Sequence, residues 1–540
     1  MDKEKILKGL SAEAIAYINI LEERIKELEQ RIEKLTEQFL LAQKSRYAPK
    51  SEKGKYIFPG GLVQESLFNE AEAVAEEEPA PPEPEIIIKQ HARKQKRTKA
   101  ELSKELPVKK EVIDIPENER VCNICEGELH RIGEEFVRSE LSIIPAQAYM
   151  TETYQVNYAC SCCAKETDEA NIIKPDVPKP IIKRGLASPS SAAHIFYQKY
   201  VNSQPLYRQQ EDWKNFGVII CRGTLANWII YISSHWLAPL WEAWKGILLT
   251  APVIFADETV TQVLKEPEKT PQSKSRMWVY ATGRAGPAPI VLYEYKPDRG
   301  GENAKQFLSG ARDFYLQTDG YAGYKAVENA IHCGCWAHLR RKFNEAMPKS
   351  PPKDNPAYIG MKHCQKLFDI ERTFDEGEIT PEERFIQRQE KSKPALDDFF
   401  AWVKTLNPLA GSKLAEAVTY AKNQEEPLST FLKDGHLDIS TNRVENAIRP
   451  FALGRKNWLF ADTVAGANAS AVAYSITETA KLNGINPYDY LLYIFSELPS
   501  ILTQNPDADL SPFFPWDSGI AQRCRALKDR LHNSFLSSLF

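Results

Sequence analysis

The amino-acid sequence predicts a multidomain α+β protein, and three observations support this prediction. A heptad repeat near the start predicts a coiled coil. Two Cys-x2-Cys pairs farther on predict a small zinc-ribbon-like module. Beyond them, β-branched and aromatic runs alternate with helical segments, which predicts an α/β domain among helical neighbours. At 540 residues the chain is also too long for one hydrophobic core, so about two to four domains are expected.

The composition excludes several classes of protein. Hydrophobic residues make up 43% and charged residues 26%, which is usual for globular rather than disordered chains. The net charge of -4 hides local asymmetry and says little about nucleic acid. The ten cysteines fall mostly in two clusters, which favours metal binding in a reducing cytosol over disulfides. No signal peptide is visible, and the most apolar stretch, 236–255, carries charges and prolines, so a cytoplasmic protein without membrane contact is expected.

Residues 1–46 are expected to form a coiled-coil dimerisation helix. Isoleucine at position a and leucine at position d recur at alternating steps of three and four, a combination that favours parallel two-stranded coils. The positions are Ile18, Leu21, Ile25, Leu28, Ile32, Leu35 and Phe39. The alternative is an amphipathic helix packed on its own domain, because about three heptads is short for a coil.

Residues 47–115 are expected to be a linker. Its first half is acidic and rich in proline, and its second half, with RKQKRTK at its centre, is basic. Neither half has enough apolar residues to fold alone. The basic half could follow DNA phosphates, or the two halves could form a solvated tail that neutralises itself.

Residues 116–183 are expected to form a zinc-binding module. Two Cys-x2-Cys turns each present two thiolates on one side, and two such turns complete a tetrahedral shell. The expected ligands of one structural zinc ion are Cys122, Cys125, Cys160 and Cys163. Cys162 leaves the register of the second pair open by one residue, and reduced thiols without metal are the alternative. Because four ligands fill the shell, this zinc ion is not expected to be catalytic.

Residues 184–250 are expected to be helical and to contain a helix-turn-helix-like DNA-binding region. Two amphipathic stretches, LYRQQEDWKNF and RGTLANWIIYI, are joined through Gly217. The same pattern is common in helical domains that do not bind DNA, so that alternative stays open.

Residues 251–346 and 438–480 are expected to form the two parts of a ribonuclease-H-like α/β domain. Three strand-like runs, 253–264, 275–283 and 289–297, precede a helix, a strand at 314–319, a second helix from Tyr321 and a strand at 331–336. This is the element order of the ribonuclease-H-like fold. Asp257 would then lie on the first strand and Asp319 at the end of the fourth, side by side at one edge of the sheet.

The remaining segments are expected to be helical. Residues 347–437 are polar and charged with proline punctuation, which predicts an all-helical insertion within the α/β domain. Residues 481–540 are expected to form a helical C-terminal region and a tail whose role the sequence does not indicate.

Three carboxylates are the candidate catalytic residues. Asp257 and Asp319 each follow an apolar strand-like run, and Glu445 lies on a predicted helix rich in arginine and lysine. Such oxygen ligands suit two Mg2+ (or Mn2+) ions per active site, because hard divalent cations prefer carboxylates and keep positions open for phosphate. Glu445 also has a purely structural interpretation, as the third residue of a helix capped by Asn442.

Other glutamates compete for the role of the third carboxylate. Glu258 adjoins Asp257, but neighbouring residues on a strand point to opposite faces, so Glu258 should point away from the metal ions. Glu328 and Glu345 are expected on structural helices.

Basic residues follow two of the candidate segments. Arginine and lysine supply sequence-independent contacts to DNA phosphates. The candidate DNA-binding residues are Arg340, Arg341, Lys342, Arg449, Arg455 and Lys456.

Four motifs, taken in this order, resemble the DDE transposase of the insertion-sequence 66 family. They are DET at Asp257, TDGYAGY around Asp319, CWAHLRRKF from Cys335 and ENAIRPFALGRKNWLFA from Glu445. The similarity runs from SRYAPKSEK, near residue 45, to NPYDYLLYIF, near residue 486. Asn446 departs from the family pattern, in which an arginine is expected after the glutamate, and this removes one presumed phosphate contact.

The resemblance implies a DDE-type transposase that cleaves and joins insertion-sequence DNA by two-metal phosphoryl transfer. It also implies the zinc module and the helical insertion, and it places Cys335 and His338 in the wall of the active site rather than in a zinc site. The expected partners are the terminal inverted repeats of the element, target DNA, a second copy of the chain in a homodimer or higher oligomer, and small accessory proteins. The expected location is the bacterial nucleoid.

Two other functions remain open at this point. A catalytically silent DNA-binding regulator would keep the dimer, the zinc module and the helix-turn-helix, but the presence of all three carboxylates argues against it. A ribonuclease-H-like nuclease would hydrolyse nucleic acid without strand transfer. The long N-terminal region and the predicted dimer fit paired element ends better than a nuclease acting alone.

Overall fold

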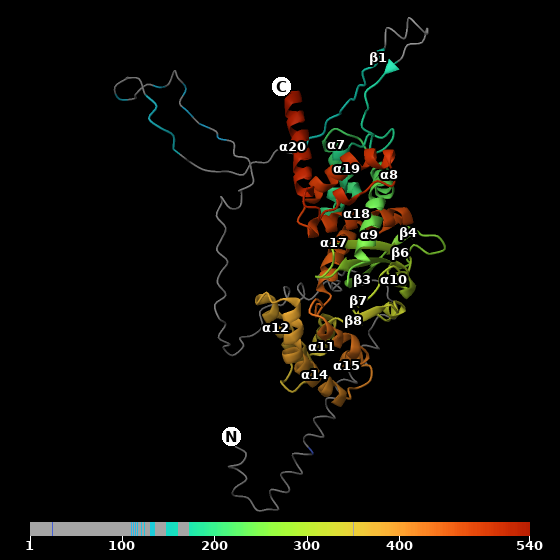
Figure 1. Cartoon of the computed structure of the whole chain (residues 1–540), viewed down its shortest axis with the longest axis vertical. Coiled ribbons are helices and arrows are strands. Elements are labelled where there is room, and N and C mark those ends of the chain that lie inside the picture. Colours follow the sequence, from blue (N-terminus) through green and yellow to red (C-terminus); the bar gives the residue numbers. More distant parts are fainter. Residues whose placement is uncertain are drawn as a thin grey trace, which may run out of the picture. The chain divides into compact units, whose positions relative to one another are not determined.

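In this computed structural model the described residues are 24, 110, 112, 114, 116, 120, 124, 130–135, 147–159, 172–348 and 350–539. The predicted coiled coil, apart from Arg24, and the four predicted zinc ligands lie outside these residues. The chain divides into two compact units, one of residues 1–75 and 152–540 and one of residues 76–151. The described positions of the second unit are neither helical nor in strands. The helices and strands of the described residues belong to the first unit (Figure 1).

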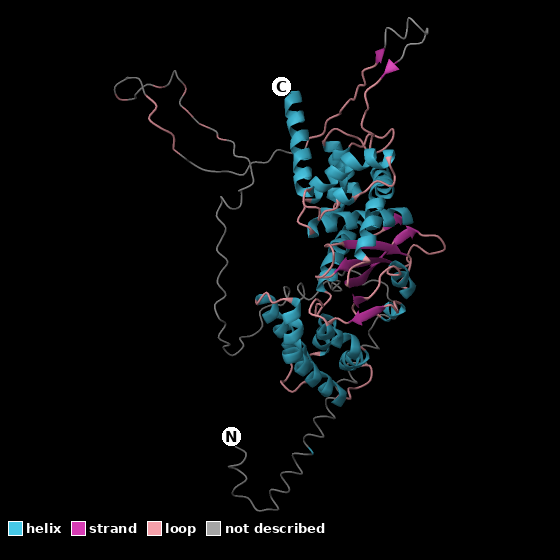
Figure 2. Cartoon of the chain, in the orientation of Figure 1, coloured by secondary structure: helices cyan, strands magenta, loops and turns pink. Residues whose placement is uncertain are grey.

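A mixed sheet lies at the centre of this unit (Figure 2). It has five strands in the order β6-β5-β3-β7-β8. β3 pairs antiparallel with β5, and β5 pairs antiparallel with β6, whereas β7 and β8 run parallel to β3. The bounds are β3 (Val253–Thr261), β5 (Ser275–Thr282), β6 (Val291–Lys296), β7 (Phe314–Gln317) and β8 (Ala330–Cys333). Four of these strands lie within stretches that the sequence predicts as extended, and β8 overlaps the predicted strand at 331–336.

Shorter elements complete the sheet region. α10 (Gly301–Phe307) joins β6 to β7, and the helix expected after Tyr321 is only the short 3-10 helix η4 (Ala322–Ala326). β4 (Val263–Lys265) pairs in parallel with β9 (Ala461–Thr463), and β1 (Tyr158–Ala159) pairs with β2 (Ile172–Ile173). The chain therefore runs meander, helix, strand, short helix, strand through the central sheet, which is the predicted order.

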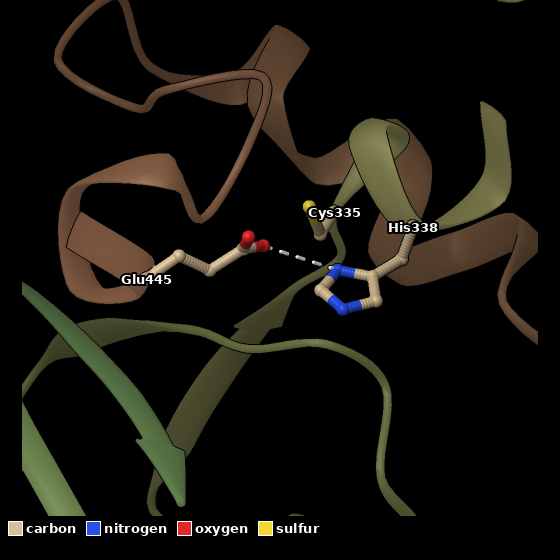
Figure 3. Close-up of side chains that lie close together, drawn as sticks. All are labelled: Cys335, His338 and Glu445. Atoms are coloured by element: carbon tan, nitrogen blue, oxygen red, sulfur yellow. Dashed lines mark ion pairs between the residues drawn. The ribbon is translucent and has the colours of Figure 1, made fainter. Parts of the chain in front are cut away.

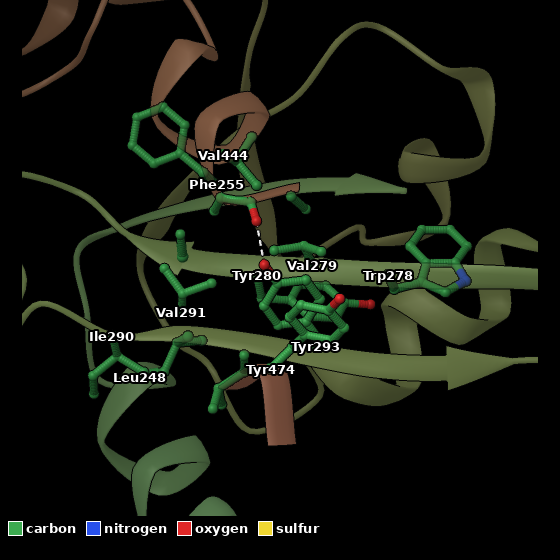
Figure 4. Packing of buried hydrophobic residues seen from close by; sticks show 14 of the residues in the cluster. Leu248, Phe255, Trp278, Val279, Tyr280, Ile290, Val291, Tyr293, Val444 and Tyr474 are labelled. Atoms are coloured by element: carbon green, nitrogen blue, oxygen red, sulfur yellow. Dashed lines mark hydrogen bonds between the residues drawn. The ribbon is translucent and has the colours of Figure 1, made fainter. Parts of the chain in front are cut away.

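Both faces of the sheet are covered, which explains why its central strands read as nearly continuous apolar runs. On one face, Val444 of α17 (Asn442–Trp458) packs close to Phe255 and Val279 (Figure 4). On the other face, the rings of Tyr280 and Phe307 stack with centroids 3.7 Å apart. Asp257 is two residues beyond Phe255 and therefore shares the α17 face of β3.

The outer edge of β6 is closed by side chains of α18 (Val464–Leu482). The hydroxyl of Ser475 accepts a hydrogen bond from the backbone N–H of Tyr293 at 2.8 Å. The hydroxyl of Thr479 accepts from the N–H of Val291 at 3.1 Å and donates to its carbonyl at 2.9 Å. An edge strand has unpaired backbone groups that can recruit another strand, and here serine and threonine satisfy some of them.

The segment before the sheet is helical, as predicted, and packs with the C-terminal helices. Its elements are α6 (Pro189–Phe196), η2 (Tyr197–Val201), α7 (Leu206–Asn215), α8 (Arg222–Ile232), η3 (Ser233–Leu237) and α9 (Ala238–Leu248). The C-terminal elements are α18, α19 (Pro487–Gln504), η7 (Ser511–Phe513) and α20 (Ile520–Leu539). Aromatic pairs join the two groups: Phe196 contacts Phe495, and Tyr200 contacts Tyr474, each with ring centroids 5.1 Å apart.

The predicted helix-turn-helix stretch forms two contacting helices, α7 and α8. Gly217, in the connection, has a φ of 82°, a left-handed conformation that glycine adopts without steric cost. The inner side of α8 is buried and includes Leu225, Trp228 and Ile229. None of the helices in the described part of the chain is long and apolar enough to cross a membrane.

Every element described between residues 350 and 435 is helical, in agreement with the predicted insertion. The elements are α12 (Pro356–Glu376), α13 (Pro381–Gln387), η5 (Arg388–Ser392), α14 (Lys393–Thr405), α15 (Lys413–Asn423), α16 (Glu425–Ser429) and η6 (Thr430–Lys433). α12 and α15 pack on α11 (Trp336–Ala346), and α16 and η6 contact β8 (Figure 1). The insertion therefore lies against the β8 side of the sheet.

Candidate catalytic site

The two predicted aspartates lie at the same level of adjacent parallel strands, Asp257 within β3 and Asp319 just after β7. The last register pair of β3 and β7 is Phe255 with Gln317, and Asp257 and Asp319 each come two residues later. The Oδ1 atom of Asp257 accepts a hydrogen bond from the N–H of Glu258 at 2.8 Å. The Oδ1 atom of Asp319 accepts from the N–H of Tyr321, also at 2.8 Å. The fold thus brings the two aspartates together, as the sequence predicts.

The electrostatics of this pair favour a bound cation. Burial raises the pKa of Asp257 well above its usual range, and the negative charges of Asp319 and Glu258 raise it further, against a smaller opposing effect of His338. Carboxylates that share a site repel each other when both are ionised. A divalent cation between them would relieve this repulsion, so the donor set fits a hard metal ion.

A helix of the insertion holds the turn that carries Asp319. The hydroxyl of Tyr420, on α15, donates to the carbonyl of Asp319 at 2.7 Å, and the side chain of Gln424 donates to the carbonyl of Gly320 at 3.4 Å. Gly320 has a φ of 84°, and a Cβ atom there would lie 3.0 Å from the Tyr420 hydroxyl. The turn therefore depends on contacts from a segment about one hundred residues later in the chain.

Glu445 lies in the first turn of α17, and its carboxylate points toward the ring of His338 (Figure 3). Its Oε1 atom accepts a hydrogen bond from the hydroxyl of Thr441 at 3.2 Å and lies 3.6 Å from Nδ1 of His338. Its Oε2 atom lies 3.6 Å from a guanidinium nitrogen of Arg341. The alternative interpretation, a capping pair with Asn442, is wrong, because the N-cap is Thr441 and it makes no side-chain bond to the helix backbone.

Cys335 and His338 link the start of α11 to the segment before α17. Cys335 is the N-cap of α11, and its buried Sγ atom accepts from the N–H of Thr441 at 3.3 Å. Burial lowers the pKa of His338, but the Cys335 thiolate and then Glu445 outweigh burial and raise it to about 9. Burial raises the pKa of Cys335, yet His338 and Thr441 together bring it below its usual value. Cys335 and His338 thus each shift the other's pKa toward the charged form, beside Glu445.

Among the described residues, one group of three histidine, cysteine or acidic side chains brings its ligand atoms within 4.8 Å of one another. That group is Cys335, His338 and Glu445. Asp257, Asp319 and Glu445 do not form such a group in the described part of the chain. Glu445 belongs to α17, which packs on the face of the sheet that carries the aspartates. Its carboxylate, however, lies close to Cys335 and His338.

Glu258 takes part in a different cluster. Its carboxylate accepts a hydrogen bond from the hydroxyl of Tyr324 at 2.6 Å and pairs with Arg299 at 2.5 Å. The cross-strand partner of Glu258 is Trp278, whose ring contacts Tyr324 at a centroid distance of 5.7 Å. Glu258 thus lies on the face opposite α17, in agreement with the prediction from strand alternation.

A family model described as Transposase IS66 family matches residues 184–469, which include all three carboxylates. The chain belongs to the IS66 transposase family. Its relatives include the uncharacterized protein y4jD of Sinorhizobium fredii, which is 31% identical over 433 residues that cover 77% of this chain and 81% of that protein. The uncharacterized protein y4hP of the same organism is 30% identical over 443 residues that cover 76% of this chain and 77% of that protein.

Two further models match other parts of this IS66-family protein. The zinc-finger binding domain of transposase IS66 matches residues 119–164, which supports zinc binding by this segment. All four predicted zinc ligands fall within that range. The IS66 C-terminal element matches residues 475–516, a range that contains α19.

The six basic residues predicted to contact DNA differ in the contacts they make within this IS66-family protein. Arg340 and Lys342 lie over the rings of Phe368 and Tyr420, at 5.7 Å and 5.2 Å from the ring centroids. Arg341 faces Glu445, as described above. Arg455 donates to the carbonyl of Val260, so at least part of its guanidinium serves the fold.

The other two lie on α17. Arg449 is partly exposed and Lys456 is exposed. Sequence reasoning missed Thr441 and Tyr420 as neighbours of the site. Thr441 could have been found, because a residue four positions before Glu445 lies one helical turn away. No pattern in the sequence places Tyr420 near Asp319.

Proposed function

We propose that this chain is a DDE-type transposase, which cleaves and joins insertion-sequence DNA by metal-dependent phosphoryl transfer. The observation that carries the proposal is the pair Asp257, within β3, and Asp319, just after the parallel neighbour β7, where the charge of Asp319 raises the pKa of the Asp257 carboxyl. We also propose that this part of the chain is a ribonuclease-H-like domain, in agreement with the strand order β6-β5-β3-β7-β8, in which two parallel strands extend one antiparallel meander.

The proposed metal ligands are Asp257, Asp319 and Glu445. Two magnesium or manganese ions, when bound, would act as Lewis acids that activate a water or a 3′-hydroxyl and stabilise the leaving oxygen. The chain itself aligns the two aspartates by strand register and holds Glu445 on α17 through Thr441, His338 and Arg341. Cys335 contributes by fixing Thr441, so it acts as a positioning residue.

The proposed DNA contacts combine basic residues of two helices. Arg340, Arg341 and Lys342 lie on α11, and Arg449, Arg455 and Lys456 lie on α17, which itself packs on β3. Such residues bind phosphates without reading the sequence, so DNA affinity should fall steeply with salt. The helix-turn-helix-like region, the basic linker and the zinc module with Cys122, Cys125, Cys160 and Cys163 are proposed as further DNA-binding parts. A homodimer or higher oligomer and small accessory proteins are proposed partners.

The deciding experiment uses purified full-length protein, duplexes that carry the terminal repeats of its own element, and a target plasmid. If the chain is a transposase, we expect magnesium-dependent cleavage at the element end, followed by joining of that end to the plasmid. Cleavage without joining would identify a nuclease. Binding of the repeats without cleavage, with accessory proteins supplied, would identify a regulator.

Tyr420→Phe is predicted to slow cleavage while leaving DNA affinity unchanged. The variant keeps the ring but removes the donor to the Asp319 carbonyl, a hydrogen bond of about 1 kcal/mol. If that energy serves to position Asp319, the cleavage rate falls about fivefold. Single-turnover rates at saturating magnesium measure the effect, and Tyr358→Phe on α12 is the control. An unchanged rate would mean that Tyr420 serves only the fold.

A further inference from the structure

We propose that Cys335, His338 and Glu445 form a second metal site, which binds a thiophilic divalent cation of the zinc type. The three side chains offer one sulfur, one ring nitrogen and one carboxylate oxygen, all within 4.8 Å of one another (Figure 3). The site is distinct from the zinc module, whose proposed ligands are four cysteines.

The spacing of the nitrogen and oxygen donors suits a tetrahedral ion, and the sulfur lies within 4.8 Å of both. Ligands at about 2.0–2.3 Å from zinc lie roughly 3.3–3.8 Å from one another. Nδ1 of His338 and Oε1 of Glu445 are already 3.6 Å apart. Three protein ligands leave a fourth position for water, which is the arrangement of open zinc sites.

The bonding of each donor leaves it available to a cation. Nδ1 of His338 is buried without a hydrogen-bond partner, and its distance of 3.6 Å from Glu445 is longer than a hydrogen bond. The sulfur of Cys335 accepts from the N–H of Thr441 and sits at the N-terminus of α11, both of which favour the thiolate form that binds metal. Arg341, near the other carboxylate oxygen, would hold the orientation of Glu445.

The donor set also determines which cation binds. Magnesium prefers oxygen ligands, whereas thiolate and imidazole select zinc. Glu445 is the proposed third ligand of the magnesium reaction, so a zinc ion held by Cys335 and His338 would keep this carboxylate from the aspartates. Zinc should therefore inhibit cleavage. This consequence rests on the proposed function, but zinc binding itself does not.

The first test measures metal content of the full chain without DNA. After loading with zinc and removal of excess, wild-type protein should hold about one more zinc per chain than Cys335→Ser or His338→Gln, because each variant removes one of three ligands. Cys364→Ser, which changes a buried cysteine of α12, is the matched control and should keep the wild-type content. Equal zinc content in wild type, folded Cys335→Ser and folded His338→Gln would overturn the proposal.

A spectroscopic test identifies the thiolate. Cobalt substituted for zinc should give a thiolate-to-metal absorption that is larger in wild type than in Cys335→Ser, with the zinc module contributing equally to both. His338→Gln should retain the sulfur band only at higher cobalt concentration, with an affinity loss of about tenfold or more. Identical spectra and titrations for wild type and both variants would exclude cobalt, and by analogy zinc, from this cluster.

The inhibition test separates the two proposals. Zinc added to the magnesium reaction should slow wild type, and each variant, measured against its own rate without zinc, should need about tenfold more zinc. Cleavage by wild type that is insensitive to zinc would contradict the metal site and leave the transposase standing. Zinc binding at this cluster in a protein that never cleaves DNA would support the site and contradict the proposed function.

Discussion

Asp257→Asn should abolish magnesium-dependent cleavage and at the same time raise the stability of the folded protein at neutral pH. Asparagine keeps the shape of the side chain but removes a charge that the proposed metal ions need. In metal-free protein that charge is unfavourable, because Asp257 is buried beside Asp319 and Glu258. Removal of a charge that repels its neighbours should therefore stabilise the fold, in line with the trade-off between activity and stability at active sites.

The pH dependence of this effect has a definite sign. The pKa of Asp257 is higher in the folded protein than in the unfolded chain, so folding favours the protonated form. The resulting loss of stability begins as pH rises through the unfolded value of about 3.9 and grows until the folded pKa is passed. Thermal midpoints of wild type and Asp257→Asn, measured without metal, should therefore converge at low pH and diverge at neutral pH. A variant that cleaves DNA, or one that is less stable than wild type at pH 7, would contradict the assignment.

Glu445→Gln is the companion variant for the third carboxylate. It should also lose cleavage, with DNA binding retained. Glu328→Gln and Glu345→Gln are matched controls, because both glutamates are exposed, Glu328 in a turn after η4 rather than in the expected helix and Glu345 beside Lys413. Normal cleavage by Glu445→Gln, with loss in either control, would show that another residue completes the site.

The strands and the two aspartates could be predicted because their signals are local. β3 and β7 are apolar, β-branched or aromatic runs, and an acidic residue at such a position is read directly from the sequence. The side of the strand taken by Glu258 followed from alternation alone. Pro450 shows the limit of such local signals, because proline removes a helical hydrogen bond and yet α17 continues past it to Trp458. Packing of α17 on β3 outweighs the hydrogen bond that proline removes.

The rest of the candidate site depends on contacts between distant parts of the chain. Cys335 and Thr441 are 106 residues apart, and Tyr420 and Asp319 are 101 residues apart. The motif of Cys335 and His338 was interpreted as part of the active-site wall because no second pair of ligands lies near it in sequence. Glu445, the third member of the group, comes close to Cys335 and His338 only in the folded chain. The helical insertion was predicted as a segment, but its role in holding Asp319 was not.

Arg388→Met should destabilise the protein strongly. Arg388 is fully buried on η5, where it pairs with both carboxylate oxygens of Glu371 at 2.8 Å. It also donates to the carbonyls of Phe431, Asp434 and Leu437, each within 2.8 Å. These carbonyls belong to the segment that leads from the insertion into α17, so one side chain connects α12 to the approach of the third carboxylate.

The size of the effect follows from burial. Methionine fills a similar volume, but it leaves a buried carboxylate and several carbonyls short of donors, and breaking a buried pair costs about 3–5 kcal/mol. Arg384 still contacts one oxygen of Glu371 at 2.9 Å, so about 3 kcal/mol is expected. That is a large share of the roughly 5–15 kcal/mol that stabilises a domain. Chemical denaturation measures the loss, and cleavage should fall with it because the approach to α17 loses its anchor.

Two comparisons make the Arg388 prediction specific. Lys404→Met breaks an ion pair with Glu425 that is similar in length, 2.8 Å, but exposed, and should cost about 1 kcal/mol or less. The double variant Arg388→Met with Glu371→Leu removes both charges of this pair and leaves Arg384 paired with Asp375, so it should recover part of the stability that the single variant loses. If the single variant is as stable as wild type, or the double variant is no more stable than the single one, the buried pair does not hold the insertion to the approach of α17, and Glu445 must be positioned by its own neighbours alone.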